Sequence, residues 1–146
     1  MSFTEQFDIF VCEGDSISCE VDGFTITATV ERDDDSGRPD KEMDGFWPSL
    51  NPNDAGYIGK KSRSTLARHM KQAKEVMQAW LDDEWYWCGV VLSVSKGGWE
   101  FDRAASLWGI ECNYPVKGKR RANTYLRDVA NELLSEALEQ IRCQQH

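Results

Sequence analysis

The sequence predicts an α+β fold: an antiparallel sheet, or two sheets, of about six strands in the order βββ-α-βββ-α, with two helices packed on one face. Apolar and polar residues alternate within the first 32 residues and again after residue 85, which is the two-residue period of a half-buried strand. Two longer segments carry apolar residues at three- and four-residue spacing, as amphipathic helices do. With 146 residues, the chain fits a single domain over residues 1–146.

The first 32 residues predict a three-stranded meander. We expect strands at Phe7–Cys12, Ser16–Val21 and Phe24–Arg32. In the last of these, threonines at every second position separate apolar residues, so one face should be in contact with water. Between the second and third strands, Asp22-Gly23 favours a two-residue hairpin turn, because both positions of such a turn need positive φ.

The segment 33–62 predicts no regular structure. Its first part, DDDSGRPDKEMDG, is polar and rich in turn-forming residues, which favours an exposed acidic loop. Its second part, FWPSLNPNDAGYIGKK, mixes prolines and glycines with aromatic residues. We expect this part to be ordered but irregular, held by Phe46, Trp47 and Tyr57.

Two helices are predicted, one over Ser64–Leu81 and one from Thr124 to about Cys143. Ser62 or Ser64 should cap the first helix, and Asn123 should cap the second. The apolar stripe of the first helix comprises Leu66, Met70, Ala73, Met77 and Trp80. That of the second comprises Leu126, Val129, Ala130, Leu133, Leu134, Ala137, Leu138 and Ile141.

Between these helices the pattern predicts a second meander within an α-βββ-α unit that spans residues 63–146. We expect strands at Trp85–Ser95, Trp99–Phe101 and Ser106–Asn113, with Lys96-Gly97-Gly98 as a turn. Whether the two meanders form one sheet or two is open from the sequence.

Composition favours a protein that remains in the cytoplasm. The formal net charge is −8, and there are five cysteines, odd in number and scattered along the chain. Such cysteines are typical of reduced thiols in a cytosolic protein. The amino-terminal residues do not resemble a secretory signal, and no apolar run has the length that spans a bilayer.

No familiar catalytic pattern occurs in the chain. The sequence lacks a phosphate-binding glycine loop and a nucleophile elbow, and no cysteine has a histidine base in a familiar local pattern. No C-x-x-C pair is present either. We therefore predict no enzyme activity, no metal site and no cofactor. An enzyme with an unfamiliar carboxylate site remains a third hypothesis, which a bound metal would favour.

Two acidic groups are candidates for binding a basic partner protein. One is the run at the start of the acidic loop, and the other follows one face of the last helix. The candidate residues are Asp33, Asp34, Asp35, Asp128, Glu132, Glu136 and Glu139. A solvated acidic surface with no binding role is the simpler interpretation of the same pattern.

Two basic groups precede the two helices and are candidates for binding nucleic acid. Cations at the start of a helix oppose its dipole, which makes such a run unusual without a function. The candidate residues are Lys60, Lys61, Arg63, Arg68, Lys117, Lys119, Arg120 and Arg121. The α-βββ-α order also resembles the double-stranded-RNA-binding domain in its topology alone.

The tryptophans give a further candidate site. Trp85 and Trp87 alternate with apolar residues on the predicted strand. If the sheet had an open face, these two rings would line an aromatic groove able to stack on a base, a sugar or a peptide. Packing under a helix is the alternative interpretation.

Three blocks carry a resemblance: WPSLNPNDAGYIG, LWGIECNYP and NTYLRDVANELL. Through them the chain resembles small uncharacterised proteins carried by bacteriophages, prophages and plasmids of Gram-negative bacteria, from Trp47 to about Leu138. The resemblance implies an accessory protein of a mobile element that acts in the host cytoplasm. It brings no catalytic or binding residues with it.

These observations lead to two hypotheses from different classes. The first is a non-enzymatic accessory protein that binds, and thereby inhibits, a host protein such as a nucleic-acid-handling defence complex through its acidic surface. The second is a nucleic-acid-binding module that uses the basic residues before the two helices. The sequence predicts no membrane partner and leaves the oligomeric state open.

Overall fold

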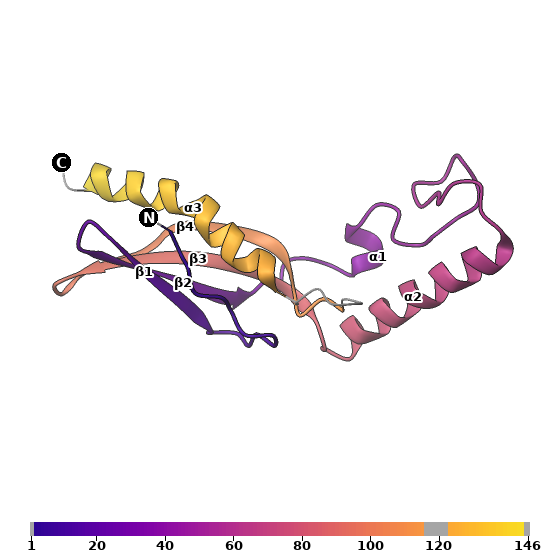
Figure 1. The fold of residues 1–146 in the computed structure, drawn as a ribbon, viewed down its shortest axis with the longest axis horizontal. Coiled ribbons are helices and arrows are strands. Elements are labelled where there is room, and N and C mark those ends of the chain that lie inside the picture. The colour runs from indigo at the N-terminus through magenta and orange to yellow at the C-terminus, as the bar shows by residue number, and fades with distance from the viewer. Residues whose placement is uncertain (1, 116–122, 145–146) are drawn as a thin grey trace. The chain divides into compact units, whose positions relative to one another are not determined.

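The computed structural model describes residues 2–115 and 123–144 (Figure 1). Two compact units make up the chain: unit 1 comprises Met1–Asp33 and Tyr86–His146, and unit 2 comprises Asp34–Trp85. Unit 1 contains the sheet and the last helix, and unit 2 contains the first two helices. Each unit is described by itself below.

The fold is α+β, as predicted, and its described residues form one antiparallel sheet of four strands in the order β1-β2-β3-β4. The strands are β1 (Ser16–Val21), β2 (Phe24–Arg32), β3 (Tyr86–Lys96) and β4 (Trp99–Cys112). The helices are α1 (Pro39–Glu42), α2 (Arg63–Leu81) and α3 (Thr124–Gln144). The prediction of about six strands is therefore wrong, and the two predicted meanders join through β2 and β3.

The β1–β2 hairpin has the predicted turn. Val21 pairs with Phe24, and the two residues between them, Asp22 and Gly23, have φ of 53° and 85°. Along β2 the apolar residues are buried while the threonines between them are half-exposed. The alternation thus correctly predicts which face of the sheet meets the core.

The predicted strand at Phe7–Cys12 is not a strand. This segment is held by side-chain amides in place of a strand ladder. Asn113 Oδ1 accepts a hydrogen bond from the Val11 N–H at 2.8 Å, and Asn113 Nδ2 donates to the Val11 carbonyl at 2.8 Å. Asn131 binds Phe3 N–H and C=O in the same two-fold manner, at 2.7 and 3.3 Å. An asparagine amide has a hydrogen-bond donor and an acceptor, as a peptide group has. It can therefore bond to the backbone N–H and C=O groups of an extended segment in place of a neighbouring strand.

Asn123 completes this arrangement, which we call the asparagine clasp (Asn113, Asn123 and Asn131). Its Nδ2 donates to the Ile9 carbonyl at 2.9 Å and to Asn113 Oδ1 at 2.8 Å, and its Oδ1 accepts from the Asn113 N–H at 2.7 Å. The prediction that the Asn123 side chain caps α3 is therefore wrong, because this side chain bonds to Ile9 and Asn113. Only the Asn123 backbone carbonyl bonds into the helix, accepting from Leu126 N–H at 3.1 Å.

The two strands predicted at Trp99–Phe101 and Ser106–Asn113 form one strand, β4. Register shifts interrupt its pairing with β3 between Cys88 and Val90 and between Leu92 and Val94. Arg103 and Gly109 on β4 have φ of 56° and 72° at these irregularities. Extra residues of this kind break the two-residue alternation without ending the strand, which is why the sequence pattern suggests two strands.

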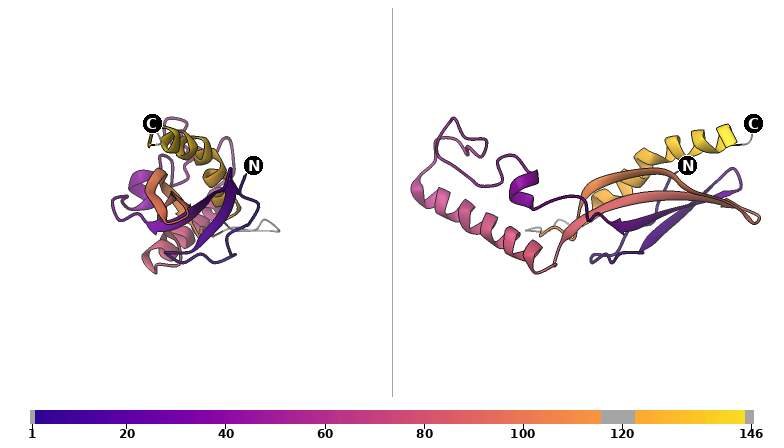
Figure 2. Two further views of the ribbon diagram at one scale, coloured as in Figure 1. Left: turned by 90° about the vertical axis from the view of Figure 1, so that its left-hand side faces the viewer. Right: turned by 180° about the vertical axis from the view of Figure 1, so that it is seen from behind.

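The core lies between the sheet and α3, which packs against β3 and β4 (Figures 1 and 2). The prediction of two helices on the sheet is thus half right: α3 covers it, whereas α2 belongs to unit 2. Several core side chains are fully buried, and each valine, leucine or isoleucine among them contributes about 1.5–3 kcal/mol. They include Ile26, Ala28, Val30, Val90, Leu92, Leu126, Ala130 and Ala137.

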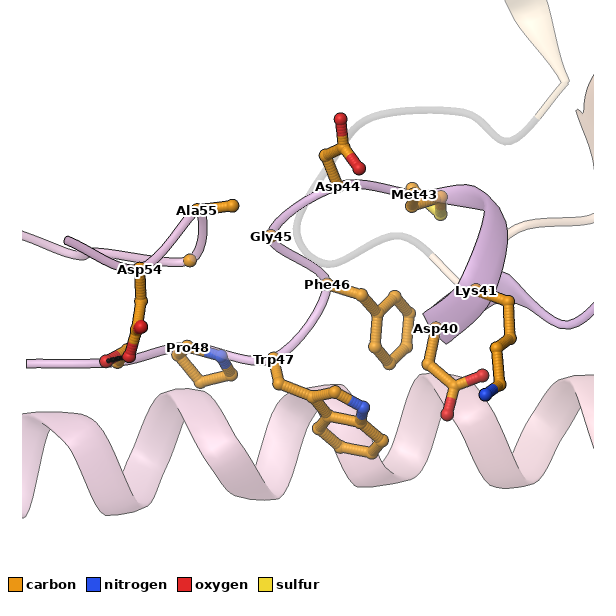
Figure 3. Close-up of a pocket in the computed structure, with 12 residues that line it drawn as sticks. Asp40, Lys41, Met43, Asp44, Gly45, Phe46, Trp47, Pro48, Asp54 and Ala55 are labelled. Carbon is orange, nitrogen blue, oxygen red and sulfur yellow. Dashed lines mark hydrogen bonds between the residues drawn. The ribbon is translucent and has the colours of Figure 1, made fainter. Parts of the chain in front are cut away.

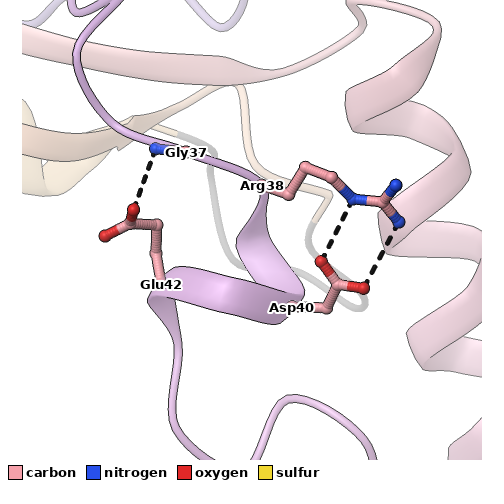
Figure 4. A network of polar contacts seen from close by, with 4 residues as sticks. All are labelled: Gly37, Arg38, Asp40 and Glu42. Atoms are coloured by element: carbon pink, nitrogen blue, oxygen red, sulfur yellow. Dashed lines mark hydrogen bonds and ion pairs between the residues drawn. The ribbon is translucent and has the colours of Figure 1, made fainter.

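Unit 2 is built around α2 and a loop rich in turns. Ser62 caps α2 as predicted, because its Oγ accepts from the Thr65 N–H at 3.2 Å. Before α2, the short helix α1 is fixed by Glu42 Oε1, which accepts from the Gly37 N–H at 3.0 Å, and by an ion pair between Arg38 and Asp40 at 3.3 Å (Figure 4). The sequence did not predict α1.

Candidate protein-binding surface

The acidic residues of α3 form one exposed face of that helix. Leu126, Ala130 and Ala137 are buried against the sheet. At roughly 3.6 residues per turn, the carboxylates fall on the opposite side of the helix. All four of them are exposed, and none makes an ion pair or side-chain hydrogen bond with the part of the chain that the structure describes. These four residues, here called the acidic face, are Asp128, Glu132, Glu136 and Glu139.

The helix that carries the acidic face is fixed at several points. Besides its apolar side, the Tyr125 hydroxyl donates to the Glu111 carbonyl on β4. On one flank, Arg127 donates to the Thr4 carbonyl at 3.4 Å, and Asn131 holds Phe3. The acidic face is therefore held in a fixed position, because the helix that carries it is bonded both to β4 and to the amino-terminal segment.

Asp33 does not join this face. Side chains alternate along a strand, so Asp33 follows Glu31 on the side of the sheet that α3 does not cover. Its Oδ2 accepts from the Gly109 N–H at 2.9 Å. Asp34 and Asp35 belong to unit 2 and have interactions of their own. Within unit 1, Asp33 is thus separate from the acidic face.

The predicted basic residues are described only in part. Lys60, Lys61, Arg63 and Arg68 are exposed around the start of α2, and none forms an ion pair with a described residue. The other group, comprising Lys117, Lys119, Arg120 and Arg121, lies outside the described residues.

Trp85 and Trp87 are buried, with 0% and 7% of their surface exposed. The Trp85 ring nitrogen donates to the Val76 carbonyl of α2 at 2.8 Å, so the Trp85 side chain is part of the interior of unit 2. Their rings therefore do not line an exposed groove. On the side of the sheet that α3 does not cover, the ring of Trp108 is 41% exposed.

Trp108 lies flat on β3 at Gly89. A methyl group added to Gly89 would stand 2.3 Å from the Trp108 ring, so only glycine admits this contact. Near it, Arg103 of β4 reaches across β3 to Glu31 of β2, with 2.9 Å between Nη2 and Oε1. The sequence signal for this site was a glycine inside a strand, which often marks the close approach of another group.

Hydroxyls line another part of this side of the sheet. A small cavity of about 100 Å³ lies there, lined by Thr27, Ser93, Val94, Ser95, Glu100 and Asp102. Ser18 and Thr27 stand opposite each other, with 3.4 Å between their hydroxyl oxygens. The part of the sheet around this cavity is therefore polar, and two of its hydroxyls face each other.

The larger cavity belongs to unit 2. It measures about 430 Å³ and is bounded by the loop from Asp40 to Gly56, including Phe46 and Trp47 (Figure 3). Its carboxylates do not converge on one point: Asp40 is paired with Arg38, Asp54 accepts from the Ser49 hydroxyl at 2.6 Å, and Asp44 turns away from the two rings (Figure 3). The cavity therefore does not form a charged binding site.

A buried cluster of Tyr86, Cys88 and Cys112 lies in the core. The Tyr86 hydroxyl donates to the Val11 carbonyl at 3.1 Å, and burial raises the pKa of Tyr86. The hydrogen bond to Cys112 and burial raise the pKa of the Cys88 thiol. The same hydrogen bond lowers the pKa of Cys112, so the two thiols act as one coupled, buried pair within the core.

Within residues 2–115 and 123–144, no group of three or more histidine, cysteine, aspartate or glutamate side chains is arranged to hold a metal ion. None of the helices in the same residues combines the length and apolar character needed to cross a membrane.

Comparison of the chain with protein-family models, with curated proteins and with solved structures found no match. The acidic face and its surroundings must therefore be interpreted from their own chemistry.

Proposed function

We propose that this protein is a non-enzymatic binding protein that docks the acidic face of α3 on a basic surface of a host protein. A nucleic-acid-handling complex is the kind of partner that has such a surface, because it must hold phosphates. The proposal includes an origin in a bacteriophage or other mobile element and an inhibitory role in the host cell.

One observation carries the proposal: four exposed carboxylates share one side of a helix and have no cationic partner among the described residues. Like charges three or four residues apart on a helix each cost about 0.2–0.5 kcal/mol. A partner rich in lysine and arginine would remove this repulsion. Complementary charge of this kind also accelerates association of the two proteins. Because salt screens the attraction, the association should weaken as the salt concentration rises.

The test compares two variants of equal net charge. The first, D128N/E132Q/E136Q/E139Q, removes the acidic face. The second, E20Q/D44N/E75Q/E84Q, removes four exposed carboxylates from other elements as a matched control. Each tagged protein is used to capture partners from a nuclease-treated lysate of a Gram-negative host. We expect one stoichiometric protein to be retained by the wild type and the control and lost by the first variant. Equal retention by both variants would contradict the proposal.

A second candidate function is nucleic-acid binding through the start of α2, which the exposed, unpaired cations Lys60, Lys61 and Arg63 favour. It predicts that duplex RNA or DNA binds with an affinity that falls steeply with salt, and that K60A/K61A/R63A reduces the salt dependence. Binding that does not change with salt would contradict it.

A further inference from the structure

The cavity of unit 2 plays no part in the proposed contact of the acidic face, yet its walls have the form of a binding site. Its volume of about 430 Å³ lies in the range of small-molecule pockets, roughly 300–1,000 Å³. Phe46 and Trp47 line it with rings whose centroids are 5.0 Å apart and whose planes differ by 86°. Trp47 keeps 37% of its surface exposed. Two apolar walls therefore meet in a right-angled corner, here called the aromatic corner.

The loop that forms the aromatic corner is fixed by its own backbone. The Ser49 N–H donates to the Gly56 carbonyl at 2.9 Å, and the Ile58 N–H donates to the Ser49 carbonyl at 3.0 Å, which joins the two ends of the loop. Nearer the rings, a methyl group on Gly45 would stand 2.6 Å from the Ala55 carbonyl oxygen, so two stretches of backbone lie in contact there. Compact loops with joined ends frequently carry a function. A cavity that exists before its ligand arrives also costs less entropy on binding than one that the ligand must order.

The carboxylates beside the aromatic corner are hydrogen-bond acceptors with capacity left. Both oxygens of Asp40 accept from Arg38 at 3.3 Å, and Asp54 Oδ2 accepts from the Ser49 hydroxyl. A carboxylate has about four acceptor sites, and Asp54 Oδ1 has no hydrogen bond to any residue that the structure describes. Figure 3 shows Asp40 and Asp54 on different sides of the two rings. A cation such as Ca²⁺ needs oxygens that converge, whereas separated acceptors suit a ligand whose O–H donors point in several directions.

The shape and charge of the cavity together indicate the chemical class of this ligand. A flat aromatic ring would stack on one wall of the aromatic corner, whereas a saturated ring has thickness and places C–H groups against both walls. An anionic ligand would meet carboxylates that outnumber the lysine, Lys41, among the described lining residues. A pure hydrocarbon would leave those carboxylates without the hydrogen bonds they make in water. A neutral saturated ring that carries several hydroxyls meets all of these conditions.

We propose that the cavity of unit 2 binds a neutral saccharide. One sugar ring packs in the aromatic corner of Phe46 and Trp47, and its hydroxyls donate to Asp40 and Asp54. This site belongs to unit 2, whereas the acidic face belongs to unit 1, so the inference goes beyond the proposed function and does not depend on it.

The test titrates glucose, galactose, mannose and N-acetylglucosamine separately into the isotope-labelled full chain. Nuclear magnetic resonance then follows the backbone amides of residues 45–56 and the ring N–H groups of the six tryptophans. We expect at least one of the four sugars to shift the amides of residues 45–56 and the Trp47 ring N–H in a saturable manner. The Trp99 ring N–H, which lies on β4 of unit 1, should not move.

Three variants locate the binding. Trp47→Leu removes one flat wall and should weaken binding of that sugar about tenfold. The matched control is Trp99→Leu, because Trp99 has nearly the same exposure, 38%, and this variant should bind as the wild type does. Asp54→Asn removes one charged acceptor and should weaken binding several-fold, while its amide oxygen can still accept from the Ser49 hydroxyl. Amide exchange in α2 should be equal in all of these proteins, which shows that unit 2 remains folded.

Several outcomes would overturn the saccharide site. They are no saturable shift of residues 45–56 with any of the four sugars, equal weakening in Trp47→Leu and Trp99→Leu, or unchanged affinity in Asp54→Asn. Saturable shifts with tetramethylammonium but with none of the sugars would assign the aromatic corner to an organic cation instead. The variant D128N/E132Q/E136Q/E139Q should bind the sugar as the wild type does, so a failure of the proposed function leaves this result unchanged.

Discussion

Units 1 and 2 hold their backbones in different ways. In unit 1 a regular sheet and α3 enclose a core in which many side chains are fully buried. In unit 2 few apolar side chains are buried, among them Pro39, Met77, Ala79 and Trp85. Its loop is instead fixed by close passage of the backbone, where a methyl group on Gly56 would lie 1.9 Å from the Trp47 carbonyl oxygen. Stability in one unit thus comes from apolar burial, and in the other from turns that only certain residues allow.

The largest effect that would test this comparison is expected in the core of unit 1. Leu92 is 0% exposed at the centre of β3, so Leu92→Ala should lower the free energy of unfolding by about 2–5 kcal/mol. Denaturant unfolding followed by amide exchange in β2 and β3 measures this loss. A cost below about 1 kcal/mol would mean that the sheet is not held by its buried side chains.

A smaller effect is expected at the backbone crossing of unit 2. Gly56→Ala forces the loop apart at the Trp47 carbonyl and should cost about 1–3 kcal/mol, as overpacking does. The matched control is Gly59→Ala, where φ is 88° and nothing lies within 4 Å, so only backbone strain is added. Amide exchange should show faster opening of residues 43–59 in Gly56→Ala than in the control, with β2 and β3 unchanged. Equal exchange in both variants would show that the crossing is not tight.

The smallest effect concerns the charge of Glu111 on β4. Burial raises the pKa of its carboxyl, so the folded state binds the proton more tightly than the unfolded state and the charged form costs stability. Glu111→Gln should therefore stabilise the protein at pH 7 by a few tenths of a kcal/mol, since solvent screens this half-exposed group. The gain should shrink as pH falls through the raised pKa and vanish below the ordinary value of roughly 4.3. A gain that grew on acidification would contradict the assignment.

The same contrast explains how far the sequence could predict the structure. Residues with a repeating environment were predictable: the alternation of β2, the turn at Asp22-Gly23 and the stripes of α2 and α3 all follow from local period. The bulges at Arg103 and Gly109 were missed because they interrupt the period inside a strand. The amino-terminal segment was misassigned because its partners are side chains more than a hundred residues away, and no local pattern encodes them.

Only part of the candidate site could be predicted from the sequence. The acidic face of α3 follows from helical spacing alone. The burial of Trp85 and Trp87 depends on which elements cover them, which residue type does not determine. The exposure of Ile9 and Phe10 could not be predicted, because the backbone of their segment is held by amides distant in the sequence.

The asparagine clasp also affects which part of unit 1 can separate before the sheet unfolds. A strand in a sheet shares its ladder with its neighbours, so its release disturbs the whole sheet. Residues 3–11 are attached to the rest of unit 1 by side-chain amides and by the buried side chains of Phe3, Phe7 and Val11. Release of this segment would break these contacts while every backbone pair from β1 to β4 remains, so we expect it to cost less free energy than global unfolding.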